Sequence, residues 1–284
     1  MANILVTGAN GQLGTELRNR SFSLLDDVFY TDVEELDITS EKAVSSFIET
    51  HEIDTIINCA AYTAVDQAEE DEARAAKVNR DAVANLANAA MKYDCLFLHI
   101  STDYVFDGTA EQPYIEKNAT NPQTVYGRTK LEGEEAIKKS GCMYIIIRTA
   151  WLYSAYGHNF VKTIARLANE RDEINVVNDQ WGTPTYAGDL AEAIIKIMEN
   201  EDLPEWEGIY HFTNEGICTW YDFAKEIVAI TGADCKVNPV TTDEYPVKAK
   251  RPAYSVLDKT KIKNTFELEI RDWRDALKSC MATF

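Results

Sequence analysis

Short apolar runs alternate with amphipathic stretches through the first half of the chain. Five runs rich in Val, Ile, Leu, Phe and Tyr predict buried strands at residues 3–7, 28–32, 54–60, 95–102 and 143–149. Between them, apolar residues recur at helical spacing in residues 11–20, 41–51, 72–93 and 126–140. Continuous apolar strands that alternate with helices are typical of a parallel sheet covered on both faces. Right-handed crossovers then predict an α/β fold with a doubly wound sheet of the Rossmann type.

The pattern is looser in the second half, where helical spacing returns near residues 159–169, 187–199, 219–231 and 272–281. We predict a dinucleotide-binding Rossmann domain in residues 1–150 and a smaller mixed α/β domain, which binds the substrate, in residues 151–284. No linker composition separates the two parts. We therefore expect them to interleave, with the helix near 187–199 packed back on the first domain.

Composition excludes several classes of partner. The 284 residues carry a net charge of −19, which argues against nucleic acid or an anionic membrane. No run of about 18 apolar residues predicts a membrane span, and the N-terminus shows no signal-peptide pattern. Six scattered cysteines without a C-x-x-C pair indicate reduced thiols, and we expect a cytoplasmic protein. The four histidines lack metal-ligand spacing, so we take them as structural.

A glycine-rich turn, "TGANGQLG", joins the first strand to the first helix. Gly8 suits a tight turn, Gly11 lets a pyrophosphate approach the backbone, and Gly14 lets the helix pack close to the sheet. A phosphate bound at the helix N-terminus is favoured locally despite the negative net charge. The predicted cofactor contacts in this turn are Gly8, Asn10, Gly11, Gln12 and Leu13.

Further cofactor contacts are predicted at the ends of the next strands. Asp32 ends the second strand, where an acid suits the ribose 2′-hydroxyl and repels a 2′-phosphate, so we favour NADH, with NADPH as the alternative. Asp37 either lies near the adenine or caps the following helix. The other predicted contacts, which have core packing as their ordinary alternative, are Ile38, Ala60, Ala61, Tyr62 and Ser101.

Three residues predict acid–base chemistry. Thr102 ends the fourth strand, where open α/β sheets bind ligands. Tyr126 and Lys130 are four apart and share one helix face, although such a pair is also an ordinary feature of a helix surface. A nearby ammonium favours the phenolate and lowers the phenol pKa from about 10, which makes a tyrosine a competent general acid–base. We therefore predict Thr102, Tyr126 and Lys130 as catalytic and also place Tyr126 and Lys130 at the cofactor.

Together, TGxxGxxG, Thr102 and Tyr-x-x-x-Lys resemble the extended short-chain dehydrogenase/reductase superfamily. More narrowly, the chain resembles the dTDP-4-dehydrorhamnose reductase family along its whole length, in "NCAAYTAVDQAE", "STDYVFDGT", "VYGRTKLEGE", "RTAWLY", "NDQWGTPT" and "RPAYSVLD". The resemblance implies hydride transfer from a nicotinamide to the C4 carbonyl of dTDP-4-dehydro-L-rhamnose, with Tyr126 as the proton donor. It also implies that Lys130 holds the nicotinamide ribose and that Thr102 hydrogen-bonds the reacting oxygen or Tyr126. The product would be dTDP-L-rhamnose.

The substrate is thus expected to be a dTDP-linked 4-keto-6-deoxy sugar. Related dehydratases carry Thr-Asp-Glu where this chain has Thr-Asp-Tyr, so the second acid needed for dehydration is absent. Predicted substrate contacts are Thr102, Asp103, Phe106, Arg148, Trp151, Asn159 and Arg251, with Lys162 beside them. Turn capping, core packing, a helix start or a solvated surface charge are the ordinary alternatives for these residues.

Some members of the family form dimers that hold magnesium between glutamates. Glu16 matches the first of these glutamates, but the second falls on Gly188, beside Asp189. We therefore predict no metal and leave open a monomer or a homodimer. Two other functions remain open as well. One is a non-catalytic subunit, like the regulatory subunit of methionine adenosyltransferase, and the other is a reductase of another nucleotide-linked keto sugar.

Overall fold

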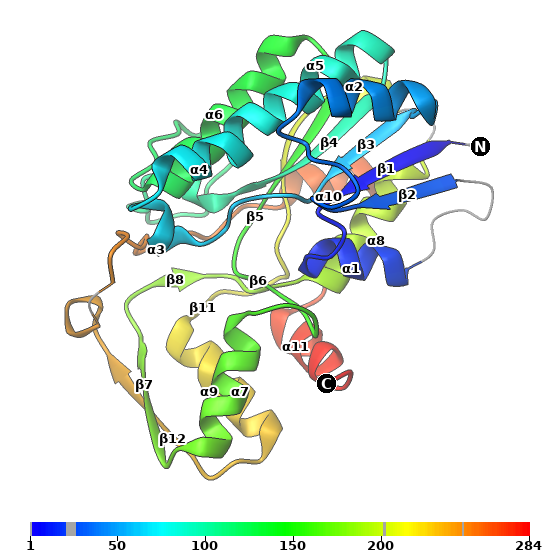
Figure 1. Cartoon of the computed structure of the whole chain (residues 1–284). Coiled ribbons are helices and arrows are strands. Elements are labelled where there is room, and N and C mark those ends of the chain that lie inside the picture. The colour runs from blue at the N-terminus through cyan, green and yellow to red at the C-terminus, as the bar shows by residue number, and fades with distance from the viewer. Residues whose placement is uncertain (1, 21–26, 201–202, 246) are drawn as a thin grey trace.

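The computed structural model describes residues 2–20, 27–200, 203–245 and 247–284, and is built on one six-stranded sheet (Figure 1). The strand order is β10-β5-β4-β3-β1-β2, and every neighbouring pair is parallel. The strands are β1 (Asn3–Thr7), β2 (Asp27–Thr31), β3 (Thr55–Asn58), β4 (Leu96–Thr102), β5 (Tyr144–Thr149) and β10 (Gly208–His211). The predicted doubly wound parallel sheet is confirmed, and β10 is a strand that the sequence pattern did not predict.

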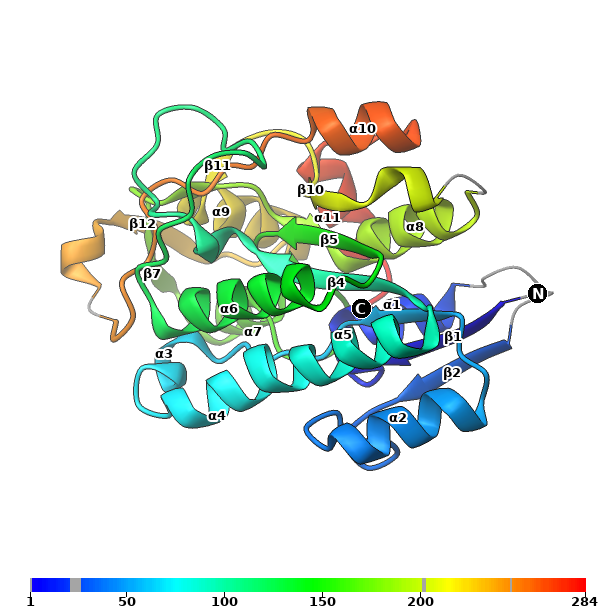
Figure 2. The same ribbon diagram turned by 90° about the horizontal axis from the view of Figure 1, so that it is seen from above.

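Helices cover both faces of this sheet (Figure 2). One face carries α2 (Glu41–Thr50), α5 (Ala82–Tyr93) and α6 (Val125–Ser140), whose apolar side chains pack on those of β1, β3, β4 and β5. The other face carries α1 (Gln12–Asn19), α8 (Ala187–Met198) and α10 (Thr260–Phe266). Because α8 and β10 come from the second half of the chain, both halves build the core around the sheet.

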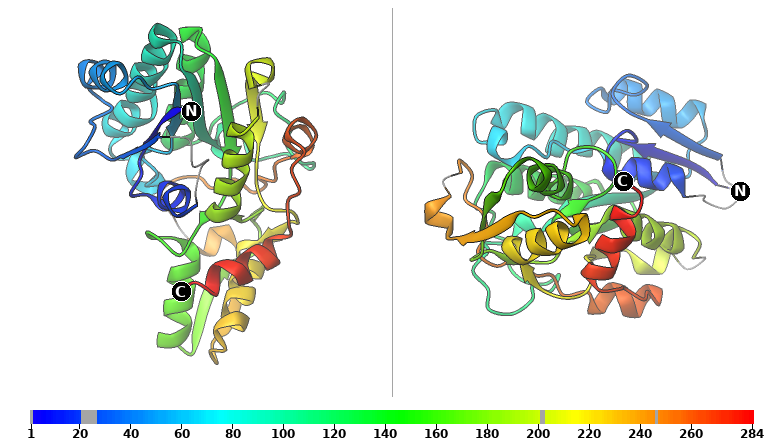
Figure 3. Two further views of the ribbon diagram at one scale, coloured as in Figure 1. Left: turned by 90° about the vertical axis from the view of Figure 1, so that its right-hand side faces the viewer. Right: turned by 90° about the horizontal axis from the view of Figure 1, so that it is seen from below.

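A second lobe lies below the carboxyl ends of the strands (Figures 1 and 3). It contains α7 (Phe160–Glu170), α9 (Trp220–Thr231) and α11 (Trp273–Met281), with the parallel pair β7 (Glu173–Val177) and β12 (Lys236–Val240). Its own apolar core includes the buried rings of Tyr153, Phe223 and Trp273. Two small strand pairs, β6 (Leu152–Tyr153) with β9 (Thr185–Tyr186) and β8 (Trp181–Gly182) with β11 (Cys218–Thr219), lie between the lobes.

The remaining elements are short. They are α3 (Val65–Ala68), α4 (Glu72–Ala76), the π-helical turn Lys77–Asp81 that joins α4 to α5, and the 3-10 turns Asp103–Val105, Leu203–Trp206 and Thr242–Glu244. Within the described ranges, no helix combines the length and the apolar character that a membrane crossing requires.

The start of α6 matters for the site because it places Tyr126 in the first turn. The Thr124 side chain accepts a hydrogen bond from the Gly127 N–H at 3.0 Å, which caps the helix. At the other end, Gly141 has a φ of 75°, the left-handed conformation that commonly ends helices. These local signals explain why the predicted bounds of this helix are correct within one residue.

Candidate functional site

The glycine turn after β1 meets the end of β3 at the carboxyl edge of the sheet. Gly8 has a φ of 65°, and a Cβ added to it would lie 2.6 Å from the Ala60 nitrogen. A Cβ on Gly14 would lie 2.5 Å from the Ala9 Cα. Only glycine therefore allows the turn to pack against the β3 end and α1 to pack against the turn.

A pocket of about 280 Å³ opens beside this turn. Among the residues predicted to bind the cofactor, it is lined by Gly8, Gly11, Asp32, Asp37, Ile38, Ala60 and Ala61. The Asp32 carboxylate accepts hydrogen bonds from the backbone N–H of Asn10 at 3.0 Å and of Val33 at 2.8 Å, which fixes it at the pocket edge. The arrangement fits a dinucleotide, because glycine backbone and a fixed acid lie where pyrophosphate and ribose are bound in this fold.

Asp37 lines the pocket but does not cap α2. Its carboxylate accepts from the Thr39 N–H at 2.9 Å and hydroxyl at 2.7 Å, and these bonds lower the pKa of Asp37. The cap of α2 is Ser40, whose side chain accepts from the Ala43 N–H. The capping alternative for Asp37 is therefore wrong.

Other predicted contacts lie around the rim. The Asn159 side chain caps α7 by accepting a hydrogen bond from the Lys162 N–H. Its amide also donates to Gln12 Oε1 at 2.9 Å, so Asn159 contacts the glycine turn as well. Leu13 is buried in the core beneath α1. Tyr62 is held through its backbone N–H and C=O, both of which bind the side chain of Asn79. Lys162 donates to the Ala155 carbonyl at 3.0 Å.

Thr102, Asp103 and Tyr126 meet where β4 ends. The Thr102 hydroxyl donates to Asp103 Oδ1 at 3.0 Å and accepts from the Tyr104 N–H at 3.2 Å. The Tyr126 ring packs edge-on against Tyr104, with ring centres 5.5 Å apart. Burial raises the pKa of the Tyr126 phenol, Asp103 and Tyr104 raise it further, and the Thr102 hydroxyl lowers it. The phenol is therefore protonated at neutral pH.

Lys130 lies one turn behind Tyr126 and is 1% exposed. Its Nζ donates to the Ile100 carbonyl at 2.6 Å and lies 3.1 Å from His99 Nε2. Burial lowers the pKa of Lys130 to about 8, against the effects of Glu134 and Cys59, which raise it. The expectation that Lys130 lowers the pKa of Tyr126 is wrong for this arrangement, because desolvation dominates at the phenol and Lys130 is not among the groups that shift it.

Asp103 is a buried acid beside the phenol. Burial raises its pKa to about 6, while the nearby Ser255 hydroxyl and the hydrogen bond from Thr102 hold the shift back. The Asp103 carboxyl therefore binds a proton at a pH about two units higher than an ordinary aspartate does.

Arg148 does not line the pocket beside the glycine turn. Its side chain is 2% exposed and binds both oxygens of the fully buried Glu134, with Nε–Oε1 at 2.9 Å and Nη2–Oε2 at 2.6 Å. Ser101 donates to the same carboxylate at 2.5 Å. The structure thus places the side chains of Arg148 and Ser101 in a buried ion-pair cluster between β4, β5 and α6, and not in the pockets where we expected substrate and cofactor contacts.

A second pocket, of about 270 Å³, is lined by Tyr104, Phe106 and Arg251, among others, and Tyr104 packs against Tyr126. Arg251 binds Asp66 Oδ2 at 2.6 Å and the Tyr104 hydroxyl at 3.2 Å. Phe106 stacks on Tyr114 with ring centres 4.3 Å apart and is buried. The pocket thus offers a guanidinium and aromatic walls next to Tyr126.

Trp151 lies two residues after the end of β5 and has a φ of 50°, and its side chain packs against the core of the second lobe. The indole stacks on Trp220 with ring centres 3.6 Å apart. A Cβ added to Gly182 would lie 2.5 Å from the indole, so the ring is clamped between these two residues.

Three polar residues of the site were missed by the sequence reasoning. Asn58 and His99 are fully buried and link β3 to Lys130, although the histidines had no ligand spacing that pointed to this. Asn79 lies in the π-helical turn and joins Tyr62 to Thr129 of α6. A π-turn within a helix has no sequence pattern of its own, but such turns are frequent at functional sites.

Glu16, the predicted match to a metal ligand, pairs with Arg20, which also bonds to Glu192 and Tyr186. A Cβ on Gly188 would lie 2.3 Å from the Arg20 guanidinium. Arg20 therefore fills the space beside Gly188. Within the described part of the chain, no three His, Cys, Asp or Glu side chains are grouped to hold a metal.

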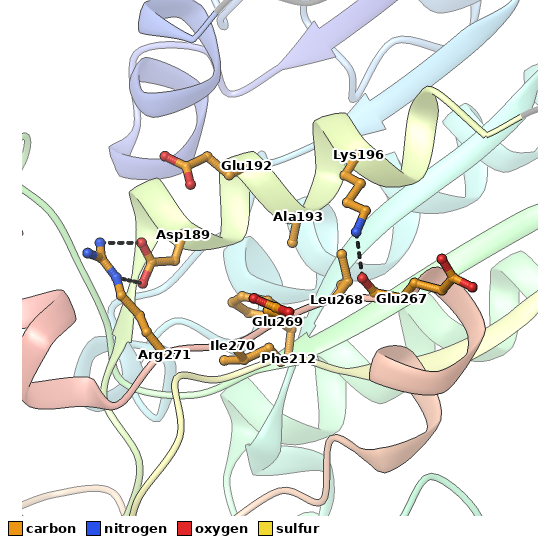
Figure 4. Close-up of a pocket in the computed structure, with 10 residues that line it drawn as sticks. All are labelled: Asp189, Glu192, Ala193, Lys196, Phe212, Glu267, Leu268, Glu269, Ile270 and Arg271. Carbon is orange, nitrogen blue, oxygen red and sulfur yellow. Dashed lines mark hydrogen bonds and ion pairs between the residues drawn. The ribbon is translucent and has the colours of Figure 1, made fainter.

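A cavity of about 560 Å³ between α8 and residues 267–271 lies apart from these pockets (Figure 4). Its two basic side chains are already engaged: Arg271 binds both oxygens of Asp189, and Lys196 donates to the Glu267 carbonyl. With acidic side chains around it, this cavity does not suit an anionic nucleotide.

Comparison with known proteins gives a consistent result. The family model described as RmlD substrate binding domain matches residues 1–284. A dTDP-4-dehydrorhamnose reductase of Aggregatibacter actinomycetemcomitans is 45% identical, with 99% of each chain covered. A probable dTDP-4,6-dihydroxy-2-methyloxan-3-one 4-ketoreductase of Streptomyces antibioticus is 43% identical, over 96% of this chain and 92% of that one. The crystal structure of dTDP-4-dehydrorhamnose reductase from Bacillus anthracis, in complex with NADP, has a TM-score of 0.95 at 37% identity and covers 100% of this chain and 99% of that one.

Proposed function

The chain belongs to the RmlD substrate binding domain family, and from this premise we propose that it is a nicotinamide-dependent 4-keto reductase of dTDP-linked sugars. Its substrate is dTDP-4-dehydro-L-rhamnose and its product is dTDP-L-rhamnose. One observation carries the proposal: a partly buried, protonated phenol lies beside a threonine hydroxyl at the end of β4, on the same edge of the sheet as the glycine turn. The enzyme is an oxidoreductase acting on a CH–OH group.

The first lobe, with α8 and β10, would hold the cofactor. Gly8, Gly11 and the N-terminus of α1 would bind the pyrophosphate, and Asp32 would bind the adenosine ribose. The fixed carboxylate of Asp32 favours NADH over NADPH, because it repels a 2′-phosphate. The Bacillus anthracis relative is in complex with NADP, so the cofactor preference requires a direct comparison. When bound, the cofactor supplies the hydride.

In the reaction, Tyr126 gives its phenolic proton to the C4 oxygen as the carbonyl carbon receives the hydride. One carbonyl, one hydride and one proton thus give one secondary alcohol. A raised phenol pKa suits this direction, because the reduction needs the protonated form. Thr102, whose hydroxyl lies beside the phenol, would orient Tyr126 or bind the C4 oxygen, and Lys130 would bind the nicotinamide ribose.

The substrate would lie between the lobes. Arg251 is the residue that we assign to the diphosphate, because a guanidinium binds phosphate oxygens in a bidentate manner. In this structure Arg251 binds Asp66, so a diphosphate would have to compete with that carboxylate. Asp103 would accept a hydrogen bond from a sugar hydroxyl, and Phe106 and Trp151 would provide apolar walls.

One relative favours a second substrate. The Streptomyces antibioticus protein, at 43% identity, is named as a 4-ketoreductase of a different dTDP-linked keto sugar. The same catalytic residues serve any 4-keto sugar that places its carbonyl at Tyr126. The second candidate is therefore the same chemistry on another dTDP-linked 4-keto-6-deoxy sugar.

The test is to mix the protein with NADH and enzymatically prepared dTDP-4-dehydro-L-rhamnose and to follow nicotinamide absorbance. We expect turnover in the wild type and a loss of about 10²–10⁴-fold in Tyr126→Phe, with NADH binding retained. NADH binding without turnover on any dTDP-linked 4-keto sugar would instead indicate a non-catalytic binding subunit. Turnover only on a different keto sugar would select the second candidate.

A further inference from the structure

Two carboxylates on one short segment hold two parts of the candidate active site. The segment is residues 65–70, made of α3 and the turn that follows it, and it lies beside the N-terminal end of α6 (Figure 2). The Glu69 side chain reaches the start of α6, and the Asp66 side chain reaches the loop that carries Arg251. The residues that we assign to the proton and to the diphosphate, Tyr126 and Arg251, are therefore both tied to this segment.

Glu69 holds the first turn of α6, which carries Tyr126. Its Oε1 accepts a hydrogen bond from the Val125 backbone N–H at 2.9 Å. An N–H in the first turn of a helix has no acceptor within the helix, and a carboxylate also suits the positive end of the helix dipole. The neighbouring Ala68 is fully buried and belongs to one apolar cluster with Val125 and Tyr126. The first turn is thus held by packing as well as by the hydrogen bond.

The cap of α6 does not have the same effect. Thr124 accepts from the Gly127 N–H, but it directly precedes α6 and moves together with the helix. Glu69 belongs to another element, 56 residues away in the sequence, and so fixes the first turn relative to the rest of the site. Asn79 anchors the next turn through Thr129. Glu69 therefore acts mainly on the turn that contains Tyr126.

Asp66 holds the loop of Arg251 by two different bonds. Its Oδ2 accepts from the Arg251 guanidinium at 2.6 Å, and its Oδ1 accepts from the Ala249 backbone N–H at 3.0 Å. Ala249 is 1% exposed. A bound diphosphate would therefore compete for the guanidinium and leave the bond to Ala249 in place.

The two parts that are tied to this segment also contact each other. Arg251 Nη1 donates to the Tyr104 hydroxyl at 3.2 Å, and the Tyr104 ring packs against Tyr126. The contacts form a closed ring, whose members in order are Asp66, Arg251, Tyr104, Tyr126 and Glu69. Each member of a closed ring is restrained from two sides.

We propose that Glu69 and Asp66 are positioning residues with separate tasks: Glu69 places Tyr126 for proton transfer, and Asp66 places the loop of Arg251 for binding of the diphosphate. This assignment rests on the proposed function. It separates two kinetic constants, because a displaced proton donor lowers kcat, whereas a displaced binding loop raises KM. If the segment had a structural role only, removing either acid would change both constants alike.

The test of Glu69 compares Glu69→Ala with Glu69→Gln in turnover of dTDP-4-dehydro-L-rhamnose. Glu69→Ala should lower kcat about 10-fold with little change in KM, because a displaced general acid loses part of a contribution of about 10²–10⁴-fold. Glu69→Gln keeps an oxygen that accepts from the Val125 N–H and should recover most of kcat. An unchanged kcat in Glu69→Ala, or a loss that lies in KM instead, would overturn the assignment.

The test of Asp66 compares Asp66→Ala with Asp66→Asn. Both remove the charge that competes with the diphosphate, but Asp66→Asn keeps an oxygen for the Ala249 N–H. KM for the sugar nucleotide should therefore be about 10-fold higher in Asp66→Ala than in Asp66→Asn, which is the weight of one hydrogen bond. Equal KM values would overturn the role of Asp66.

Glu70→Ala is the matched control. Glu70 lies on the same segment and pairs with Lys248, but both side chains are exposed, and such a pair contributes little. Both kinetic constants should keep their wild-type values. A control that changes them as much as Glu69→Ala or Asp66→Ala does would show a structural role of the segment and overturn the proposal.

Two measurements decide the inference without turnover. The Kd of dTDP, from isothermal titration calorimetry, should be about 10-fold higher in Asp66→Ala than in Asp66→Asn. Hydrogen exchange of the amides at the start of α6 should be faster in Glu69→Ala than in Glu69→Gln. Both differences in a protein that reduces no dTDP-linked 4-keto sugar would count against the proposed function and for the two contacts. Turnover without these differences would refute the inference alone, and a wild type that does not bind dTDP would refute both.

Discussion

Replacing Arg148 by methionine should lower the free energy of unfolding and leave KM for the substrate unchanged. The side chain is 2% exposed and its partner Glu134 is fully buried, so the substitution leaves a carboxylate in the core without its ion-pair partner. Breaking such a buried pair costs about 3–5 kcal/mol. Since whole domains are stable by about 5–15 kcal/mol, the loss is a large fraction of the free energy of unfolding. Met replaces the aliphatic part of the lost side chain, which limits the contribution of a cavity.

The assay is urea denaturation followed by tryptophan fluorescence, together with KM for the keto sugar. The double variant Arg148→Met/Glu134→Gln removes both charges and should recover most of the loss, because a neutral amide needs no counter-ion. Arg166→Met is the matched control, since Arg166 and Glu170 form an exposed pair on α7 that is worth about 0.5 kcal/mol or less. An Arg148→Met protein that is as stable as this control but has a raised KM would refute the reasoning and return Arg148 to the substrate site.

Three further outcomes are expected. Asp32→Ala should raise KM for NADH about 10–100-fold, because a charged hydrogen bond is worth about 1.5–3 kcal/mol. KM for NADPH should stay unchanged or fall, because the repulsion of the 2′-phosphate is removed. Equal effects on both cofactors would contradict this. The folded-state pKa of Asp103 is raised from 3.8 to about 6, so its contribution to stability is present below pH 4 and lost as the pH rises to 6. Relative to Asp103→Asn, the wild-type free energy of unfolding in urea titrations should fall by about 3 kcal/mol over this pH window. A rise would refute the assignment. Gly182→Ala should displace the Trp151 indole and raise KM for the sugar nucleotide without changing the Kd of NADH, measured by fluorescence titration, whereas an unchanged KM would remove Trp151 from the substrate site.

The elements with strong local signals were predictable from sequence. The first strand matches its predicted range, residues 3–7, and α6 begins within one residue of its prediction because Thr124 caps it and Gly141 ends it. The strand β10 was missed because Gly208–His211 is only four residues long and begins with glycine. Its pairing with β5 makes it a strand, and a tertiary pairing of this kind leaves no local pattern.

The site was predictable to the extent that it follows from the fold. Open α/β sheets bind ligands at the carboxyl ends of their strands, which pointed to Thr102, and the chain that leaves this strand end leads to the helix that carries Tyr126. Arg148 was misplaced because its partner Glu134 belongs to another element, and sequence does not show which charges meet in the core. The pKa of Tyr126 was predicted in the wrong direction because the shift depends on burial, which only the packed structure reveals.

The contribution of the second half of the chain to the central sheet has a consequence for biosynthesis. When residues 1–150 have left the ribosome, the edge of β5 is unpaired and the sheet face that α8 covers is bare, because β10 ends only at His211. At about 5–20 residues per second, this exposure lasts several seconds. The nascent protein therefore cannot complete its nucleotide-binding half before most of the chain has been translated, and a fragment that stops at residue 150 should be a substrate for chaperones and proteases.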